Sequence, residues 1–171
     1  MQHRINIGDF HGDVWPEPEV LSHCILTKKG IEELQKTGND NWGLGVDGLY
    51  RTEHLPPLSW KTKSQPTRVQ ADLQFWIDPD LGILLYYTKS GGGYSEYCLS
   101  KGDMMRLHSW VRTLHGDLRP VGLYIPFDRA WAAIREFMER EGELPQAIEW
   151  VDARNIPPGT FPDPWEHPEI T

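Results

Sequence analysis

The stretch that decides the fold runs from Pro126 to Trp150 and reads PFDRAWAAIREFMEREGELPQAIEW. Its apolar side chains recur every three or four residues, which is the spacing of one helical face, and charged side chains take the opposite face. The apolar face comprises Phe127, Trp131, Ile134, Phe137 and Met138. Pro126 suits a helix start, Asp128 can cap it, and Gly142 and Pro145 are typical of a helix end. The stretch predicts an amphipathic helix that lies on a sheet, followed by a short strand.

Three strands are predicted before this helix. Leu73 to Ile77 alternates apolar and polar residues, which is the period-2 pattern of a half-buried strand. The turn at residues 78–82 leads to a second strand, Ile83 to Thr88, and the glycines at 91–93 lead to a third, Tyr94 to Ser100. Connections this short predict an antiparallel meander.

The first seventy residues carry weaker patterns. Arg4 to Ile7 indicates a short strand, and Val20 to Leu26 is an apolar piece of undetermined type. Lys28 to Lys36 indicates a short helix that Gly38 ends. Residues 38–70 are rich in Gly, Pro and Asn and show no legible period.

A second helix is predicted between the meander and the long helix. Asp103 can cap it, Gly116 can end it, and Val121–Ile125 and Ala147–Val151 are further predicted strands. The apolar residues on one face of this helix are Met104, Leu107, Trp110, Val111 and Leu114. We therefore predict an α+β fold: a mainly antiparallel meander sheet with one long amphipathic helix packed on one face and a second, shorter helix.

The chain is predicted to form one domain and a tail. Residues 1–155 form a single α+β domain in this interpretation, because a chain of 171 residues normally makes one hydrophobic core. Residues 156–171 contain five prolines, which exclude a regular helix or a central strand. The same tail contains Phe161 and Trp165, so we expect it to pack back on the body.

Composition favours a soluble, acidic, cytoplasmic protein. The formal net charge is −8, and the segment Glu139–Thr171 has eight acidic residues against two arginines. Such a chain is repelled by nucleic acid and by anionic membranes and attracts basic proteins, although acidity can also simply keep a protein soluble. No apolar run approaches the length of a membrane helix, and the N-terminus lacks a secretory apolar region. Cys24 and Cys98 are expected to be reduced, partly buried small residues.

The meander and the long helix resemble a known family. The matching parts are LQFWIDPDLGILLYY (Leu73–Tyr87), YCLSKG (Tyr97–Gly102) and the long helix with Pro145, Ile148 and Trp150 after it. Their order over roughly residues 70–153 resembles the Imm1-type immunity proteins of bacterial polymorphic toxin systems, including those paired with nucleic-acid deaminase toxins. The resemblance implies a non-enzymatic protein that binds a cognate toxin.

A rival motif lies near the N-terminus. The stretch INIGDFHGD (Ile5–Asp13) looks like the first metal-binding motif of calcineurin-type metallophosphatases, in which an Asp and a His hold one ion of a two-metal centre. The further ligand motifs of those enzymes are absent from the sequence, and the same letters can form an Asp-capped turn. We therefore expect Asp9 and His11 to be structural, and we expect no catalytic, cofactor-binding or metal-binding residues.

Aromatic and acidic residues of the meander are the candidates for a partner face. Trp and Tyr are enriched at interface centres, and nearby carboxylates can pair with a basic partner. The candidates are Trp76, Asp78, Asp80, Tyr94, Glu96, Tyr97 and Asp103. Alternatively, the aromatics cover the second face of the sheet under the predicted Asp103–His115 helix. Trp131, Ile134, Phe137 and Trp150 are expected to serve the fold instead.

The resemblance decides between three functions. We expect an immunity protein that binds a basic toxin domain, a nucleic-acid-targeting deaminase or nuclease, and occludes its active site. The alternative is an adaptor module for another basic protein. A metallophosphoesterase that uses the Gly8–Gly12 motif ranks third.

Overall fold

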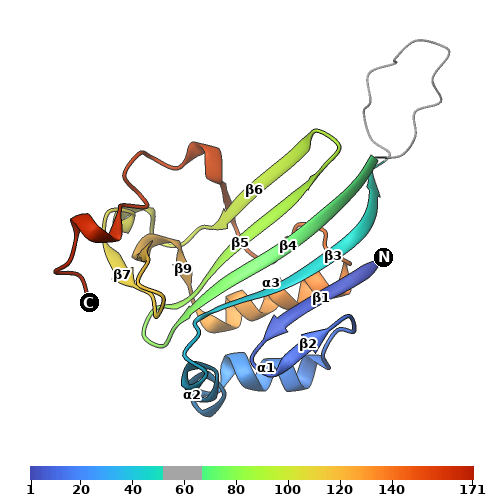
Figure 1. The fold of residues 1–171 in the computed structure, drawn as a ribbon, viewed down its shortest axis with the longest axis horizontal. Coiled ribbons are helices and arrows are strands. Elements are labelled where there is room, and N and C mark those ends of the chain that lie inside the picture. The colour runs from blue at the N-terminus through green and yellow to red at the C-terminus, as the bar shows by residue number, and fades with distance from the viewer. Residues whose placement is uncertain (52–66) are drawn as a thin grey trace, which may run out of the picture.

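The computed structural model describes residues 1–51 and 67–171, which form an α+β fold built on one large sheet (Figure 1). Seven described strands follow one another in the order β10-β6-β5-β4-β3-β1-β2, and β9 also pairs with β5. Their bounds are β1 Gln2–Ile7, β2 Phe10–Gly12, β3 Asn41–Arg51, β4 Thr67–Asp78, β5 Gly82–Gly91, β6 Tyr94–Ser100, β9 Tyr124–Ile125 and β10 Trp150–Asp152. The pairings are antiparallel, so the predicted α+β class and mainly antiparallel sheet are confirmed.

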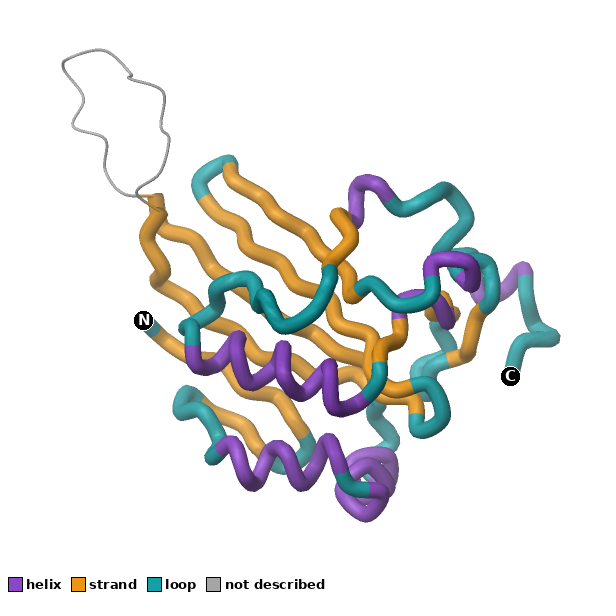
Figure 2. Tube along the Cα trace, turned by 180° about the vertical axis from the view of Figure 1, so that it is seen from behind, coloured by secondary structure: helices purple, strands orange, loops and turns teal. Residues whose placement is uncertain are grey.

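Three helices lie on one face of this sheet (Figure 2). They are α1 (Pro18–Leu26), α2 (Lys28–Lys36) and α3 (Phe127–Glu139). Alternation along β4 selects the residues that meet them: Leu73 and Phe75 are fully buried in the same apolar cluster as Phe137 of α3. Gln74 and Trp76 therefore project from the opposite, helix-free face.

The helical layer differs from the prediction of one long helix. Its 13-residue α3 shares the face with α1 and α2, and α1 occupies the apolar piece whose type the sequence left open. Leu21 and Ile25 are one helical turn apart in α1 and fully buried, so this short segment does have a helical period. Among the described residues, no helix combines the length and apolar character needed to span a bilayer.

The end of α3 uses a glutamate where the sequence pattern suggested only a glycine. Glu141 adopts a left-handed conformation with φ of 48°, and the N–H of Gly142 donates to the carbonyl of Phe137 at 2.9 Å. This is the hydrogen-bond pattern of a Schellman cap. A left-handed conformation is unfavourable for glutamate, and the side chain of Glu141 is held by His3 Nε2 at 2.6 Å. The cap thus joins α3 to β1.

One end of the helix-free face is covered by non-helical segments. They are the hairpin β7 (Trp110–Arg112) and β8 (Leu118–Pro120) and the 3₁₀ turns at Met104–Arg106, Val121–Leu123 and Ala153–Asn155. Leu107, Leu123 and Tyr124 pack there against Trp76 and Leu84. A second, smaller apolar cluster therefore forms on the side of the sheet away from the helices.

The predicted helix over Asp103–His115 is wrong. Asp103 does cap, because its side chain accepts a hydrogen bond from the N–H of Met105, but only a 3₁₀ turn follows and the chain then enters β7. Gly122 explains the early end: a Cβ there would collide with the backbone of Asp103 and Arg106, so two turns pack backbone against backbone. Leu114, which the helix would have buried, is 55% exposed at the hairpin turn.

Two further predictions need correction. The predicted strand Val121–Ile125 is a 3₁₀ turn followed by the two-residue β9. Region 38–70, for which the sequence predicted no element, contains the long strand β3 and the start of β4. Glycines 43 and 45 interrupt the apolar alternation of β3, so the strand pattern was not recognised. The remainder of that region, residues 52–66, lies outside the described residues.

Phe137 is expected to be a principal stabiliser of the helical layer. Its ring is fully buried and lies 6.3 Å, centroid to centroid, from the rings of both Trp15 and Tyr87. Replacing it in Phe137→Ala should lower the free energy of unfolding by about 3–5 kcal/mol, measured by chemical denaturation. Arg135→Ala is the control, because the Arg135 side chain is 53% exposed on the same helix. Equal stabilities of the two variants would contradict this packing.

Cys98 is expected to make the protein sensitive to alkali. Burial, with the nearby carboxylates of Glu96 and Asp152, raises the pKa of its thiol from 9.0 to about 11. The unfolded chain then loses the thiol proton before the folded chain does, so stability contributed by Cys98 is full below pH 9 and falls as the pH rises toward 11. Unfolding free energies between pH 8 and about 10.5 should fall more steeply for wild type than for Cys98→Ala. Parallel curves would refute the assignment.

Candidate functional site

The helix-free face carries an open cleft of about 590 Å³, within the range of ligand sites. Its floor consists of sheet residues and its walls come from β8 and from the C-terminal segment. The floor residues are Gln74, Trp76, Leu84, Tyr86 and Leu99, and the wall residues are Arg119, Ala153, Ile156, Pro157, Gly159, Thr160 and Phe161. We treat this cleft as the candidate functional site.

Strand register explains the composition of the floor. Gln74 lies opposite Tyr86, Trp76 lies opposite Leu84, and Tyr86 lies opposite Leu99 in the pairing of β4, β5 and β6. Directly opposed residues of antiparallel strands project from the same face, so these five side chains share one surface. The floor is therefore apolar and aromatic with one amide and one phenol.

Arg119 is the charged side chain in the lining of this cleft. Its guanidinium carbon lies 4.5 Å from the centre of the Trp76 ring and 5.9 Å from that of Phe161. Its nearest carboxylate oxygen among the described residues is Asp117 Oδ2, 3.5 Å from a terminal nitrogen. The Nε–H group is buried and has no hydrogen-bond partner among the described residues. The cation is thus stacked on aromatic rings and only weakly paired.

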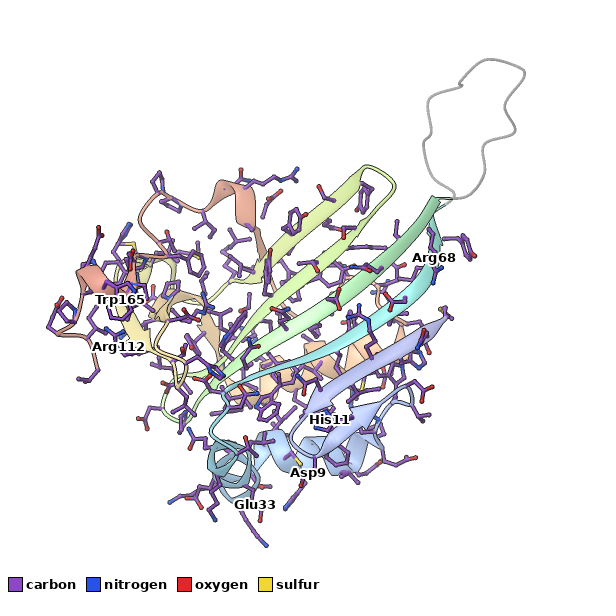
Figure 3. The ribbon with its side chains drawn as sticks, in the orientation of Figure 1. Asp9, His11, Glu33, Arg68, Arg112 and Trp165 are labelled. Atoms are coloured by element: carbon purple, nitrogen blue, oxygen red, sulfur yellow. The ribbon has the colours of Figure 1, made fainter. Side chains whose placement is uncertain are left out.

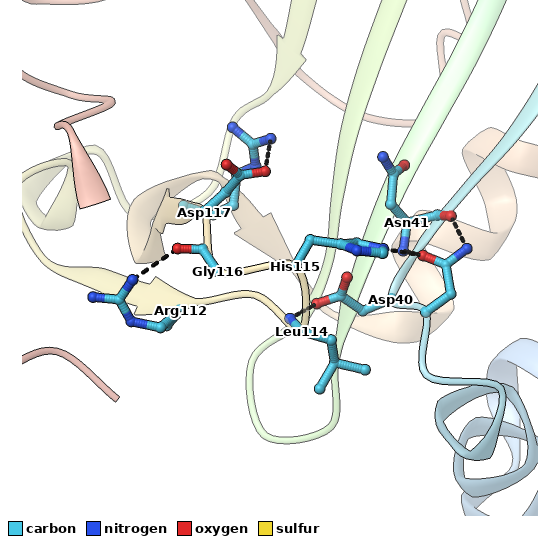
Figure 4. Close-up of polar contacts among 9 residues, drawn as sticks. Asp40, Asn41, Arg112, Leu114, His115, Gly116 and Asp117 are labelled. Carbon is cyan, nitrogen blue, oxygen red and sulfur yellow. Dashed lines mark hydrogen bonds and ion pairs between the residues drawn. The ribbon is translucent and has the colours of Figure 1, made fainter. Parts of the chain in front are cut away.

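The hairpin that carries Arg119 is tied to the start of β3 (Figure 4). Asp40 Oδ2 accepts a hydrogen bond from the N–H of Leu114 at 2.7 Å, and His115 Nε2 lies 2.7 Å from Asn39 Oδ1. Asp40 is buried, so its bond to Leu114 is shielded from water. These contacts hold the turn between β7 and β8 and, through it, the position of Arg119.

The C-terminal wall is tied to the same hairpin. Trp110 Nε1 donates to the carbonyl of Thr160 at 2.9 Å. Arg112 donates to the carbonyls of Ile170 and His167, each at 2.8 Å, and Figure 3 shows it beside the segment that carries Trp165. The chain beyond residue 155 is therefore bonded to β7, which places Phe161 over the cleft.

A polar groove continues the helix-free face toward β1. Arg4 lies there over Gly45, and its guanidinium donates at 2.8 Å to both Asp47 Oδ2 and Asp72 Oδ1. Burial raises the pKa of the Asp72 carboxyl, while Arg4 opposes that rise. A Cβ at position 45 would strike both Arg4 and Asp72, so glycine makes room for this ion-paired group.

The structure places the predicted aromatic partner residues on two faces. Trp76 is in the cleft floor, 7% exposed, and Tyr97 projects from the same face two residues before Leu99. Burial and the neighbouring Tyr97 raise the pKa of the Tyr86 phenol, so these two phenols are close. Glu96 lies opposite Lys89 in the pairing of β5 and β6 and projects from the other face of the sheet. Its carboxylate accepts a hydrogen bond from the hydroxyl of Tyr94 at 2.9 Å.

The predicted acidic partner residues lie in turns or beside them, where two of them accept hydrogen bonds from backbone N–H groups. Asp78 Oδ1 accepts hydrogen bonds from the N–H groups of Asp80 and Leu81, both at 2.9 Å, in the turn between β4 and β5. Asp80 is exposed in the same turn, and Asp103 caps the 3₁₀ turn after β6. The seven predicted partner residues therefore do not form one continuous surface: Trp76 lines the cleft and Tyr97 projects from the same face, whereas Tyr94 and Glu96 project from the opposite face.

The motif with Asp9 and His11 forms a tight hairpin. Ile7 of β1 pairs with Phe10 of β2, and Gly8 takes the positive φ of 56° that the turn requires. Figure 3 shows Asp9 and His11 beside this hairpin, far from Arg112 and Trp165. Within residues 1–51 and 67–171, no group of three or more His, Cys, Asp or Glu side chains is placed to hold a metal ion.

Sequence reasoning missed Arg119 and Tyr86. Tyr86 belongs to an apolar run without alternation, but counting outward from the turn at residues 79–81 would have paired it with Gln74. Arg119 gave no usable signal, because the hairpin that carries it was predicted to be part of a helix and a loop. Tyr87, the neighbour of Tyr86 in β5, faces the helices instead: it is fully buried and donates to the carbonyl of Gly142 at 3.0 Å.

Comparisons of this chain with protein-family models, with curated proteins and with solved structures find no match.

Asp40 is expected to position the wall of the cleft. Asp40→Ala leaves the N–H of Leu114 without its buried acceptor, which should cost about 1–3 kcal/mol of unfolding free energy. Hydrogen exchange at the Leu114 amide should accelerate by more than exchange in β4. Asp40→Asn is the matched control, because its amide oxygen can still accept the bond. Unchanged exchange at Leu114 in Asp40→Ala would show that the turn is held by other contacts.

Proposed function

We propose that this protein is a non-enzymatic immunity protein that binds a cognate bacterial toxin domain and covers its active site. The observation that supports this best is the cleft of the helix-free face, where Trp76, Tyr86 and Phe161 surround Arg119. Aromatic residues and arginine are the types most enriched at the energetic centres of protein interfaces. A partner held on this face would be blocked sterically, without any chemical step in this chain.

The resemblance to Imm1-type proteins supports the same class of function. Its first two matching parts, Leu73–Tyr87 and Tyr97–Gly102, fall mainly on β4, β5 and β6, the strands that supply the cleft floor. We further propose that the toxin acts on nucleic acid, as a deaminase or a nuclease, and is basic. The net charge of −8 would accelerate its encounter with such a partner.

Two adjacent residues of β6 can locate the interface. Tyr97 projects from the face of the cleft, whereas Glu96 projects from the face that carries the helices. A partner on the helix-free face would therefore contact Tyr97 and not Glu96. Since both residues belong to the same strand, a change in the strand itself would affect them together.

The experiment starts with the partner that co-purifies with the protein from its native cells. That partner should be toxic when expressed alone, and co-expression of this chain should restore growth. Tyr97→Ala should then speed dissociation of the complex, about tenfold for each 1.4 kcal/mol of binding energy lost, with little change in the unfolding midpoint. Glu96→Gln, which can retain the hydrogen bond from Tyr94, should dissociate like wild type.

Three results would count against the proposal. A captured basic partner that is harmless when expressed alone would favour an adaptor function. A toxic partner whose effect persists with this chain present would exclude immunity. Faster dissociation in Glu96→Gln together with normal dissociation in Tyr97→Ala would move the interface to the helical side.

A further inference from the structure

The cleft contains a cation with unused hydrogen-bonding capacity. The Arg119 side chain is only 22% exposed, and its guanidinium lies over the rings of Trp76 and Phe161. Stacking engages the flat face of a guanidinium and leaves its N–H groups available in the plane. The two ring contacts therefore supply no hydrogen-bond acceptor to the N–H groups of Arg119.

The described part of the chain supplies little to balance this cation. Among the described residues, the ion pair of Arg119 is to Asp117, at 3.5 Å, and the Asp117 side chain is 55% exposed to water. The buried Nε–H has no acceptor among residues 1–51 and 67–171. A buried donor without an acceptor is unfavourable, so the free protein holds this guanidinium with part of its hydrogen-bonding capacity unsatisfied.

The other residues that line the cleft indicate the chemical character of the rest of the ligand. Leu84, Leu99 and Ile156 give an apolar surface, and the rings of Trp76 and Tyr86 suit a planar group. The amide of Gln74 and the hydroxyl of Tyr86 can orient polar atoms on it, as in other sites of this volume. The lining thus suits an apolar or aromatic body with an acceptor at one end.

We propose that this cleft binds a small molecule that carries an oxyanion, a carboxylate or a phosphate, on an aromatic or apolar body. Arg119 binds the oxyanion through the N–H groups of its guanidinium, because the planar fork of this side chain matches two oxygens. The body lies on the floor beside Trp76 and Tyr86. This inference goes beyond immunity, because it concerns a small ligand and holds whether or not the protein partner is a toxin.

The test uses benzoate and phenyl phosphate as probes and benzamide as their uncharged counterpart. Each is titrated into the ¹⁵N-labelled protein at constant ionic strength, and the arginine Nε–H signals are followed by NMR. The Arg119 signal, identified by its absence from the spectrum of Arg119→Lys, should shift downfield and saturate with at least one anion. Saturation by benzoate alone assigns a carboxylate ligand, and saturation by phenyl phosphate alone assigns a phosphate.

Variants separate recognition of the oxyanion from general charge. Arg119→Lys keeps the charge but loses the planar fork, and it should weaken binding about tenfold or more, as followed by backbone amide signals of β4 and β5. Phe161→Ala removes one ring of the stack from a partly exposed position and should also weaken binding. Arg154→Lys is the control, because that arginine is 67% exposed and bonded to Asp152, and it should bind as wild type does.

Several experimental results would contradict the proposal. It is overturned if neither anion moves the Arg119 signal more than sodium chloride of equal ionic strength does. It is also overturned if benzamide binds as tightly as benzoate, or if Arg119→Lys and Arg154→Lys bind alike. Should Arg119→Lys fail to fold, unchanged binding in folded Phe161→Ala would overturn the stacked site. None of these results depends on the toxin, so failure here leaves the immunity proposal standing.

Discussion

The pairing of β4 with β5 is the constraint on which both layers of the molecule depend. Leu73 lies opposite Tyr87 and faces the helices, while Gln74 lies opposite Tyr86 and faces the cleft. A shift of one residue in either strand would exchange these faces and place Gln74 in the main core. The three-residue turn that Asp78 caps sets the pairing, because its side chain accepts two backbone hydrogen bonds there. Core packing and the composition of the cleft thus have one common origin.

Local sequence patterns correctly predicted the elements whose bounds depend on residues close to them in the chain. The strand Tyr94–Ser100 and the helix Lys28–Lys36 have the bounds that period and turn residues predicted. The helix predicted after Asp103 was wrong because a contact distant in sequence intervenes. Its apolar spacing fits a helix, but close backbone contact with Gly122 permits only one turn. That contact joins residues distant in sequence, and no local pattern reports it. Tertiary packing overrode propensity there.

The candidate site also contains residues that the sequence predicted and residues that it did not. Trp76 was a candidate because of its residue type and its place in the meander, and the structure places it in the cleft floor. Arg119 acquires its environment only when β8 folds over β4 and the C-terminal segment brings Phe161 to the other side. Those contacts depend on Asp40 and Trp110, which bond to the hairpin turn and to Thr160. A site assembled by such long-range bonds has no signature in sequence spacing.

Arg119, whose side chain is 22% exposed, is a cation in the cleft of a protein of net charge −8, and charges act over two different distances here. Surface charges act over about 8–10 Å at physiological ionic strength, so they would influence how the proposed basic partner approaches. Arg119 acts at contact distance in the lining of the open cleft, where its partial burial reduces screening by water and hydrogen-bond geometry decides which acceptor it binds. The net acidity of the protein and the single arginine of the cleft therefore act at different distances and do not compete. Under the proposed function, the positive charge of the toxin would be attracted from a distance, while a single oxyanion of the toxin would be bound by Arg119 at contact.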